Sequence, residues 1–382
     1  MRRSQRGFAA VLAILLVAFL VAVVGYIAYR KYHHINSVIS RNTSTNTEAQ
    51  SFNQNSYQGD ITQKLHLQTI KLSGTGQQGI AVDPNTGYVY VGAYSGINNR
   101  CMAGNPNQGQ SLLNIVDPTQ AKQVAAVQTD EAPIWPAVDD QKGVVYLATS
   151  SGSVAIHKLG TGEKLGSIHV GGLPHMPALL GNLMVVSNTY DQSETYYSVV
   201  DLNTNQVVGN YKAPALPHPI AIDEQDKLAY MMGVQSGGVE TINMDTGQPV
   251  SNFTLQGGVG QMTLSTKLGK IVTSANAPGS SMTVFDLATK KNLGTIGFNG
   301  ANTPGTSVAI DDATGLAFVV ISDQDAIGVA SLNTLKPLGY FKTGGCPYAV
   351  RLDSQRGKGY VTNSGDGTLT VFDLKDLESA LQ

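Results

Sequence analysis

A repeat of about 42 residues is the feature that most constrains the fold of this chain. Seven similar segments follow one another, and each begins with an apolar stretch that usually closes with an aspartate. These first stretches end at Asp83, Asp139, Gly181, Asp223, Ser265, Asp311 and Asp353. Successive ends lie 56, 42, 42, 42, 46 and 42 residues apart. A period of this length indicates a solenoid or a propeller, so it restricts the fold class before any single motif is considered.

Each repeat carries the signals of four short antiparallel strands. The turn after the first strand, as in DPNTGYVYV at 83–91, combines an Asp that can accept turn amides with a Gly that can adopt positive φ. A third strand closes with a turn such as DLNT at 201–204, and a fourth strand follows a K-x-L-G-x-I pattern, as in KLGSIHV at 164–170. Four such strands per repeat are typical of a propeller blade.

The turn after the third strand carries a recurrent aspartate. It occurs in four repeats, as Asp117, Asp201, Asp286 and Asp373. A catalytic carboxylate is normally unique, whereas a turn cap can recur in every repeat, so we interpret these residues as turn caps.

The two ends of the chain predict how the ring closes. Only 29 residues follow Asp353, which is enough for three strands but not for a fourth. The segment 63–76, QKLHLQTIKLSGTG, matches the fourth-strand pattern and precedes the first complete repeat. We therefore predict an all-β, seven-bladed β-propeller over residues 61–382, with an N-terminal strand completing the last blade. Such closure removes exposed sheet edges.

The N-terminal region predicts attachment to a membrane. Residues 8–29 are 22 consecutive uncharged, mainly apolar residues, long enough for one transmembrane helix. We expect a membrane anchor at 1–31, a flexible polar linker at 32–60, and the propeller on the extracytoplasmic side of the cell membrane in a single-pass arrangement. A cleaved signal peptide, or a prepilin-like leader cut between Gly7 and Phe8, is the alternative to an uncleaved anchor.

Charge and motif content argue against several functions. A formal net charge of -2 provides no basic field for a nucleic-acid partner. The two cysteines lie in no CxxC or CxxCH arrangement, so covalent c-type haem is excluded. No Gly-x-Ser-x-Gly elbow, Walker loop or HExxH helix occurs. We accordingly expect no catalytic residue, no cofactor and no metal.

The two cysteines fall on one face of the predicted ring. Cys101 lies in the long turn 98–110 of the first repeat, and Cys346 lies in the crossing into the last repeat. Closure makes these two blades neighbours, so we predict a disulfide between the two residues, with a pair of unpaired thiols as the alternative.

A resemblance to a known family becomes specific in the last repeat. Residues 358–374 read KGYVTNSGDGTLTVFDL and contain the tetrapeptide YVTN at 360–363. Over residues 61–382 the chain resembles the YVTN family of bacterial and archaeal β-propeller repeats, with departures at the shortened turn of repeat three and at Ser265. The resemblance implies a seven-bladed propeller, usually exported, that acts in surface attachment, binding or protein contacts. It implies no catalytic residue.

One face of the predicted ring carries the candidate binding residues. The crossings into the blades share this face, called here the crossing face, with the turns between second and third strands. The crossing positions are Gln78, Ile134, His175, His218, Gly260, Thr306 and Tyr348, and Trp135 lies beside them. We predict ligand contacts at Gln78, Trp135, His175, His218 and Tyr348. A pair of histidines can hold a metal or an anion, but packing of the crossings is favoured because no third ligand converges.

These observations lead to a function of binding rather than catalysis. We expect a membrane-anchored, extracytoplasmic binding protein for a protein or glycan ligand, because the loops at 98–110 and 189–197 are long and the second is rich in tyrosine. The alternatives are a propeller enzyme of lactonase-like or quinoprotein-like type acting at the tunnel mouth, and an assembly scaffold with an apolar patch on its outer rim.

Overall fold

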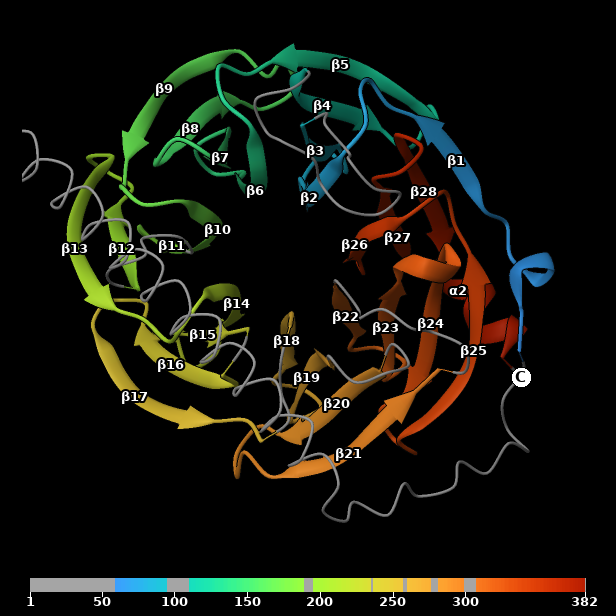
Figure 1. Cartoon of the computed structure of the whole chain (residues 1–382). Helices are drawn as coiled ribbons and strands as arrows, with labels where there is room; N and C mark the ends of the chain where they lie inside the picture. Colours follow the sequence, from blue (N-terminus) through green and yellow to red (C-terminus); the bar gives the residue numbers. More distant parts are fainter. Residues whose placement is uncertain are drawn as a thin grey trace, which may run out of the picture. The chain divides into compact units, whose positions relative to one another are not determined.

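The computed structural model describes residues 59–94, 110–188, 195–234, 236–256, 260–275, 281–298 and 307–381. These residues form seven four-stranded antiparallel sheets, arranged as blades around a ring (Figure 1). The predicted all-β, seven-bladed propeller is therefore confirmed. In every blade the first strand lies innermost and the fourth outermost (Figure 1).

The blades follow the repeats in chain order. The first three contain β2 (Gln77–Val82), β3 (Val89–Tyr94), β4 (Ser111–Asp117) and β5 (Lys122–Gln128); β6 (Pro133–Asp139), β7 (Val144–Thr149), β8 (Ser153–Lys158) and β9 (Lys164–His169); and β10 (Pro174–Leu180), β11 (Leu183–Asn188), β12 (Tyr196–Asp201) and β13 (Gln206–Lys212). The next three contain β14 (Pro217–Asp223), β15 (Leu228–Gly233), β16 (Gly238–Asn243) and β17 (Pro249–Thr254); β18 (Met262–Ser265), β19 (Lys270–Ala275), β20 (Ser281–Asp286) and β21 (Asn292–Gly297); and β22 (Val308–Asp311), β23 (Leu316–Ile321), β24 (Ala326–Ser331) and β25 (Lys336–Lys342). The seventh contains β26 (Pro347–Asp353), β27 (Lys358–Asn363), β28 (Thr368–Asp373) and β1 (Gln68–Lys71).

Burial along the strands follows from how blades stack. The second strand β7 is buried at every position, because both of its faces pack against neighbouring blades. Such strands appear in the sequence as continuous apolar runs. The outer strands β5 and β13 alternate between exposed and partly buried positions, because one of their faces meets solvent.

The turns between first and second strands are held as the sequence indicates. Asp83 accepts hydrogen bonds from the Asn85 amide at 2.9 Å and the Thr86 hydroxyl at 2.6 Å. In the fifth blade Ser265 replaces the aspartate, and its hydroxyl accepts from the Leu268 amide at 2.9 Å. In the third blade Gly181, with a φ of 60°, opens a turn of only two residues. The departures from the repeat therefore preserve the hairpins.

The predicted caps after the third strands are confirmed at three of four positions. Asp117, Asp201 and Asp286 accept backbone amides of their turns at 2.9, 2.8 and 2.7 Å. The prediction for Asp373 is wrong. Among the described residues, Asp373 leads directly into helix α2 (Leu374–Ala380) and its side chain makes no capping hydrogen bond. The Asp373 carboxylate instead pairs with Lys358 at 2.6 Å.

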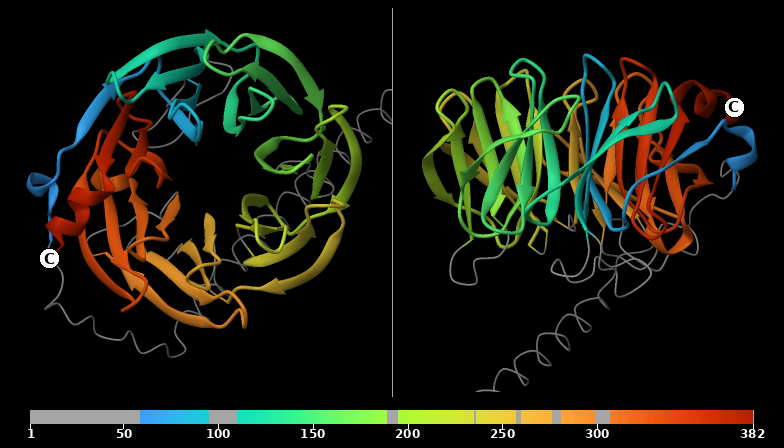
Figure 2. Two further views of the ribbon diagram at one scale, coloured as in Figure 1. Left: turned by 180° about the vertical axis from the view of Figure 1, so that it is seen from behind. Right: turned by 90° about the horizontal axis from the view of Figure 1, so that it is seen from above.

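The N-terminal strand closes the ring as predicted. Strand β1 pairs antiparallel with β28, with Ile70 opposite Leu369. Ile70 and Leu72 are buried in the same apolar cluster as Val371. In Figure 2 this N-terminal segment, drawn in blue, lies beside the red strands of the seventh blade.

A second N-terminal attachment lies just upstream. The Ile61 amide donates to the Tyr340 carbonyl, and the Tyr340 amide donates to the Gly59 carbonyl, each at 2.9 Å. Ile61 is fully buried in a cluster that includes Phe341 of β25 and Leu377 of α2. The N-terminal segment therefore attaches to blade six as well as to blade seven. The short 3-10 helix η2 (Thr62–Lys64) lies between the two attachments. A further 3-10 helix, η3 (Ser322–Gln324), joins β23 to β24.

The predicted membrane helix at 8–29 and the linker up to residue 58 lie outside the described residues. Between residues 59 and 381, within the ranges given above, no helix is long and apolar enough to cross a membrane. The anchor, the linker, the domain boundaries and the extracytoplasmic location therefore stay predictions.

Candidate functional site

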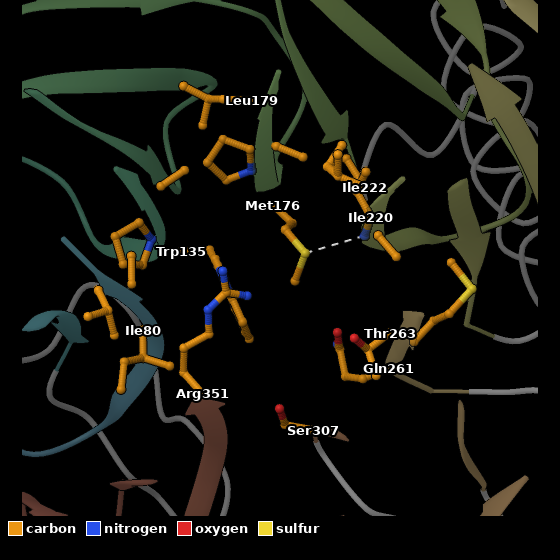
Figure 3. Close-up of a pocket in the computed structure, with 18 of the residues that line it drawn as sticks. Ile80, Trp135, Met176, Leu179, Ile220, Ile222, Gln261, Thr263, Ser307 and Arg351 are labelled. Carbon is orange, nitrogen blue, oxygen red and sulfur yellow. Dashed lines mark hydrogen bonds between the residues drawn. The ribbon is translucent and has the colours of Figure 1, made fainter. Parts of the chain in front are cut away.

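The seven first strands surround an axial channel. Its described wall encloses about 400 Å³ and is formed by β2, β6, β10, β14, β18, β22 and β26. Most lining residues are of apolar type, but the accessible surface of the wall is mainly polar. Trp135, Leu179 and Ile222 are partly exposed large apolar residues of this lining, whereas Gln261, Thr263, Ser307 and Arg351 are polar (Figure 3). Glu224 also belongs to the lining. A cavity of this size falls within the range of small-ligand sites.

A β-bulge near the start of the first strands decides which crossing residues face the channel. In β10 two residues, His175 and Met176, lie opposite the single residue Ser187. Comparable register shifts occur in the first strands of blades one, two, four and seven. Because a bulge redirects the side chains around it, Met176 lines the channel whereas His175 does not.

The bulges are held by hydroxyl groups that also join neighbouring blades. The Ser187 hydroxyl accepts from the Met176 amide and donates to the His218 carbonyl of the next blade, both at 3.1 Å. In the seventh blade the Thr362 hydroxyl accepts from the Ala349 amide and donates to the Gln78 carbonyl, both at 3.0 Å. Thr362 belongs to the YVTN tetrapeptide, so this part of the motif has a structural role.

Three of the five predicted binding residues form one row of rings. The rings of His175 and His218 stack with centroids 3.5 Å apart and an interplanar angle of 24°. Trp135 lies on the other side of His175, with its ring centroid at 6.1 Å. The row therefore runs across blades two, three and four at the crossing end of the channel. His218 also lies 3.4 Å from the side-chain amide nitrogen of Gln261, which can donate to it.

Burial keeps both histidines neutral. It lowers the pKa of His218 to about 4, and it lowers the pKa of His175 well below its ordinary value, with a further decrease from His218. His175 is only 6% exposed, and its Nδ1 atom has no hydrogen-bond partner in the described part of the chain. The pair is therefore not a cationic site at neutral pH.

The other two predicted residues lie on blades one and seven. Gln78 is buried, and its side-chain amide donates to the Tyr94 hydroxyl at 2.7 Å. Tyr348 is partly exposed at the bulge of β26 and packs against the apolar cluster shared by these two blades. For Gln78 to contact a ligand directly, its hydrogen bond to Tyr94 would have to break. Tyr348 and Trp135, in contrast, are partly accessible. The binding role of all five residues stays a prediction.

Arg351 is a channel residue that the sequence analysis missed. It lies on β26, two residues before the repeat end Asp353. The corresponding residues of the other blades are Ala81, Ala137, Leu179, Ala221, Thr263 and Ala309. The alignment of repeat ends already contained this signal, because one long cation replaces small or apolar side chains. Figure 3 shows Arg351 projecting from β26 into the channel toward Met176.

The Arg351 guanidinium projects into the channel and has no partner among the described residues. Burial lowers its pKa, although a guanidinium stays protonated at neutral pH. Solvent still reaches it through the channel, so its side chain counts as exposed. Among the residues that the structure describes, none accepts a hydrogen bond from this group or forms an ion pair with it. Glu224 is the other charged residue of the described lining.

Cys346 is buried on the crossing face, with a φ of 52°, and its amide donates to Asp325 at 2.8 Å. Cys101 lies outside the described residues, as does nearly all of the long turn 98–110. The disulfide between the two cysteines therefore stays a prediction. In the described ranges no three histidine, cysteine or acidic side chains gather as a metal site would require.

Blades, closure and channel together define this chain as a seven-bladed β-propeller protein. A solved structure of Kuenenia stuttgartiensis hydrazine synthase shares the fold, with a TM-score of 0.66 and 16% sequence identity over 79% of this chain and 97% of that one. At this identity the likeness is one of fold alone. No family model and no curated protein matches the chain, so membership of the YVTN-repeat family stays a prediction.

Proposed function

We propose that this chain is a membrane-anchored, extracytoplasmic binding protein whose propeller takes a ligand at the crossing end of its channel. The observation that carries the proposal is the row of Trp135, His175 and His218 on three adjacent blades, in which the buried His175 packs between Trp135 and His218, which are partly exposed. The propeller fold repeats the same strands in every blade, so a row of rings confined to three blades is not required by the fold. Its presence at one mouth, where side chains from several blades converge, supports recognition there.

Catalysis is less well supported by the same geometry. A general base has to reach the proton that it removes, but His175 is buried and neither histidine belongs to the described channel lining. Their low pKa values follow from burial, which is also expected of packing residues. The name of the hydrazine synthase describes that protein, and its activity does not transfer at 16% identity.

An assembly scaffold is also less well supported. The exposed large apolar side chains of the described rim are spread singly over the fourth strands of blades one to five: Val124, Leu165, Val208, Val250 and Leu293. Single exposed apolar residues are ordinary on a protein surface, whereas a scaffold should present a contiguous patch.

The proposal is tested by affinity capture with the full-length chain displayed on intact cells. Chemical crosslinking followed by identification of bound protein or glycan would compare two double variants. H218A/Y348A alters partly exposed residues of the crossing face. T266A/K267A alters an exposed turn on the opposite face, where neither side chain makes a hydrogen bond in the described structure.

We expect H218A/Y348A to reduce the captured ligand at least about tenfold and T266A/K267A to leave it unchanged. Thermal unfolding of both variants controls for loss of structure. Equal capture by the two variants, or a loss confined to T266A/K267A, would place the ligand elsewhere.

A further inference from the structure

We infer that Arg351 anchors a site inside the channel for a small organic carboxylate with an apolar body. The inference rests on the proposed binding function and deepens it, because it names the chemistry of the group that the channel takes. It is carried by three independent features of the described wall: an unpaired cation, partly exposed apolar side chains on the blades across from it, and a departure from the repeat.

The departure from the repeat indicates that the fold itself does not need this arginine. Six blades place Ala, Leu or Thr at the same position, and their first strands form without a charge there. Arginine adds a long side chain whose conformational entropy is lost when it is held. Because the fold does not require Arg351 and its side chain faces the channel, we attribute the residue to a ligand that enters the channel.

The isolation of the guanidinium indicates an anionic ligand. Solvent reaches the guanidinium through the channel, and an anion that enters can replace this hydration with charge-assisted hydrogen bonds. The described residues supply Arg351 with no acceptor, although its planar group carries five N–H donors. That fork matches the two oxygens of a carboxylate in a bidentate pair.

The charge balance favours a monoanion over a phosphate dianion. Arg351 is the single cation of the described lining, and Glu224 contributes one negative charge to the same wall. A second negative charge on the ligand would find no partner there and would be repelled by Glu224. The carboxylate is therefore preferred to phosphate.

The surround favours an apolar body attached to the carboxylate. Trp135, Leu179 and Ile222 are partly exposed and line the channel on blades two, three and four (Figure 3). An aromatic or aliphatic group of modest size would contact these side chains within about 400 Å³. Thr263, at the Arg351 position of blade five, adds a hydroxyl that can bond to a second polar group of the ligand.

Calorimetric titration of the full-length chain in detergent tests this inference with three probes. Benzoate carries the carboxylate and an apolar ring, benzamide is its neutral counterpart of the same shape, and inorganic phosphate is the competing anion. We expect benzoate to bind and the other two to bind at least about tenfold more weakly, as loss of charge-assisted hydrogen bonds requires.

Two variants assign the binding to the channel. Arg351→Met removes the charge and keeps an unbranched side chain. It should weaken benzoate binding at least about tenfold with little change in thermal stability, because the Arg351 guanidinium makes no hydrogen bond or ion pair with any described residue. Glu224→Gln removes the opposing charge and should leave benzoate binding equal or stronger. If the methionine variant fails to fold, Arg351→Lys retains a point charge without the fork and should bind benzoate with intermediate affinity.

Four results would overturn the inference: equal binding of benzoate by the wild-type and Arg351→Met proteins, equal binding of benzamide and benzoate, stronger binding of phosphate than of benzoate, or no benzoate binding at about 10 mM. Failure here with continued dependence of ligand capture on His218 and Tyr348 would leave the proposed binding function intact. Failure of both would remove the proposed function as well.

Discussion

Replacing Ile70 with alanine tests how firmly the N-terminal strand closes the ring. Ile70 is only 2% exposed and packs between blades seven and one, opposite Leu369. The change removes three buried carbon groups, and at about 0.8 kcal/mol each their transfer is worth about 2.4 kcal/mol. A cavity adds to this, but β1 has only four residues and can move inward. We therefore expect a loss of about 2.5 to 3.5 kcal/mol in the free energy of unfolding.

Urea unfolding of the full-length chain in detergent would measure this loss. Trp135 is the only tryptophan, so its fluorescence reports on the wall of the ring. I70A should lower the midpoint without changing the slope. The matched variant I168A removes the same side chain from the corresponding buried position of β9, an ordinary fourth strand, and should cost about as much. V250A, at a site 59% exposed on β17, should cost less than about 0.5 kcal/mol.

The comparison between these variants decides the outcome. If I70A costs no more than V250A, the apolar contact of β1 does not hold the ring closed, and the energetic reasoning is wrong. Equal losses for I70A and I168A would mean that the closing strand packs as tightly as a strand that belongs to its blade by chain continuity.

Further predictions concern the same ring. Removing residues 61–76 should prevent stable folding, because both N-terminal attachments are lost; a stable monomer in size-exclusion chromatography would contradict this. Non-reducing mass spectrometry should show Cys101 and Cys346 joined, with a stabilisation on the order of 5 kcal/mol from their long loop, and two free thiols would remove the prediction. Because the pKa of His218 is lowered to about 4, the unfolded chain binds more protons as the pH falls below about 6.5, so stability should be present above that pH and decrease toward pH 4. Thermal unfolding at pH 7 and pH 5 should show a smaller decrease in H218Q, and an unchanged pH dependence would refute the assignment.

The architecture was predictable because its information is local and repeated. The Asp and Gly of each turn set hairpins between neighbouring segments, and the repeat length sets how many blades form. The residues after Asp353 are one strand short of a complete blade, so the fourth-strand pattern at 63–76 was expected to supply the missing strand. Strand β1 fills this position. The sequence by itself therefore determined the blade number, the strand order and the closure.

The placement of side chains was decided by contacts between segments far apart in the chain. A one-residue bulge turns His175 into the protein and Met176 into the channel, and the sequence does not indicate which of the two residues faces inward. The attachment of Gly59 to Tyr340 joins residues nearly 300 positions apart, and no local pattern specifies it. Arg351 was visible as an exception to the repeat, but only the closed ring places it unpaired in a cavity, because the wall around it comes from all the other blades.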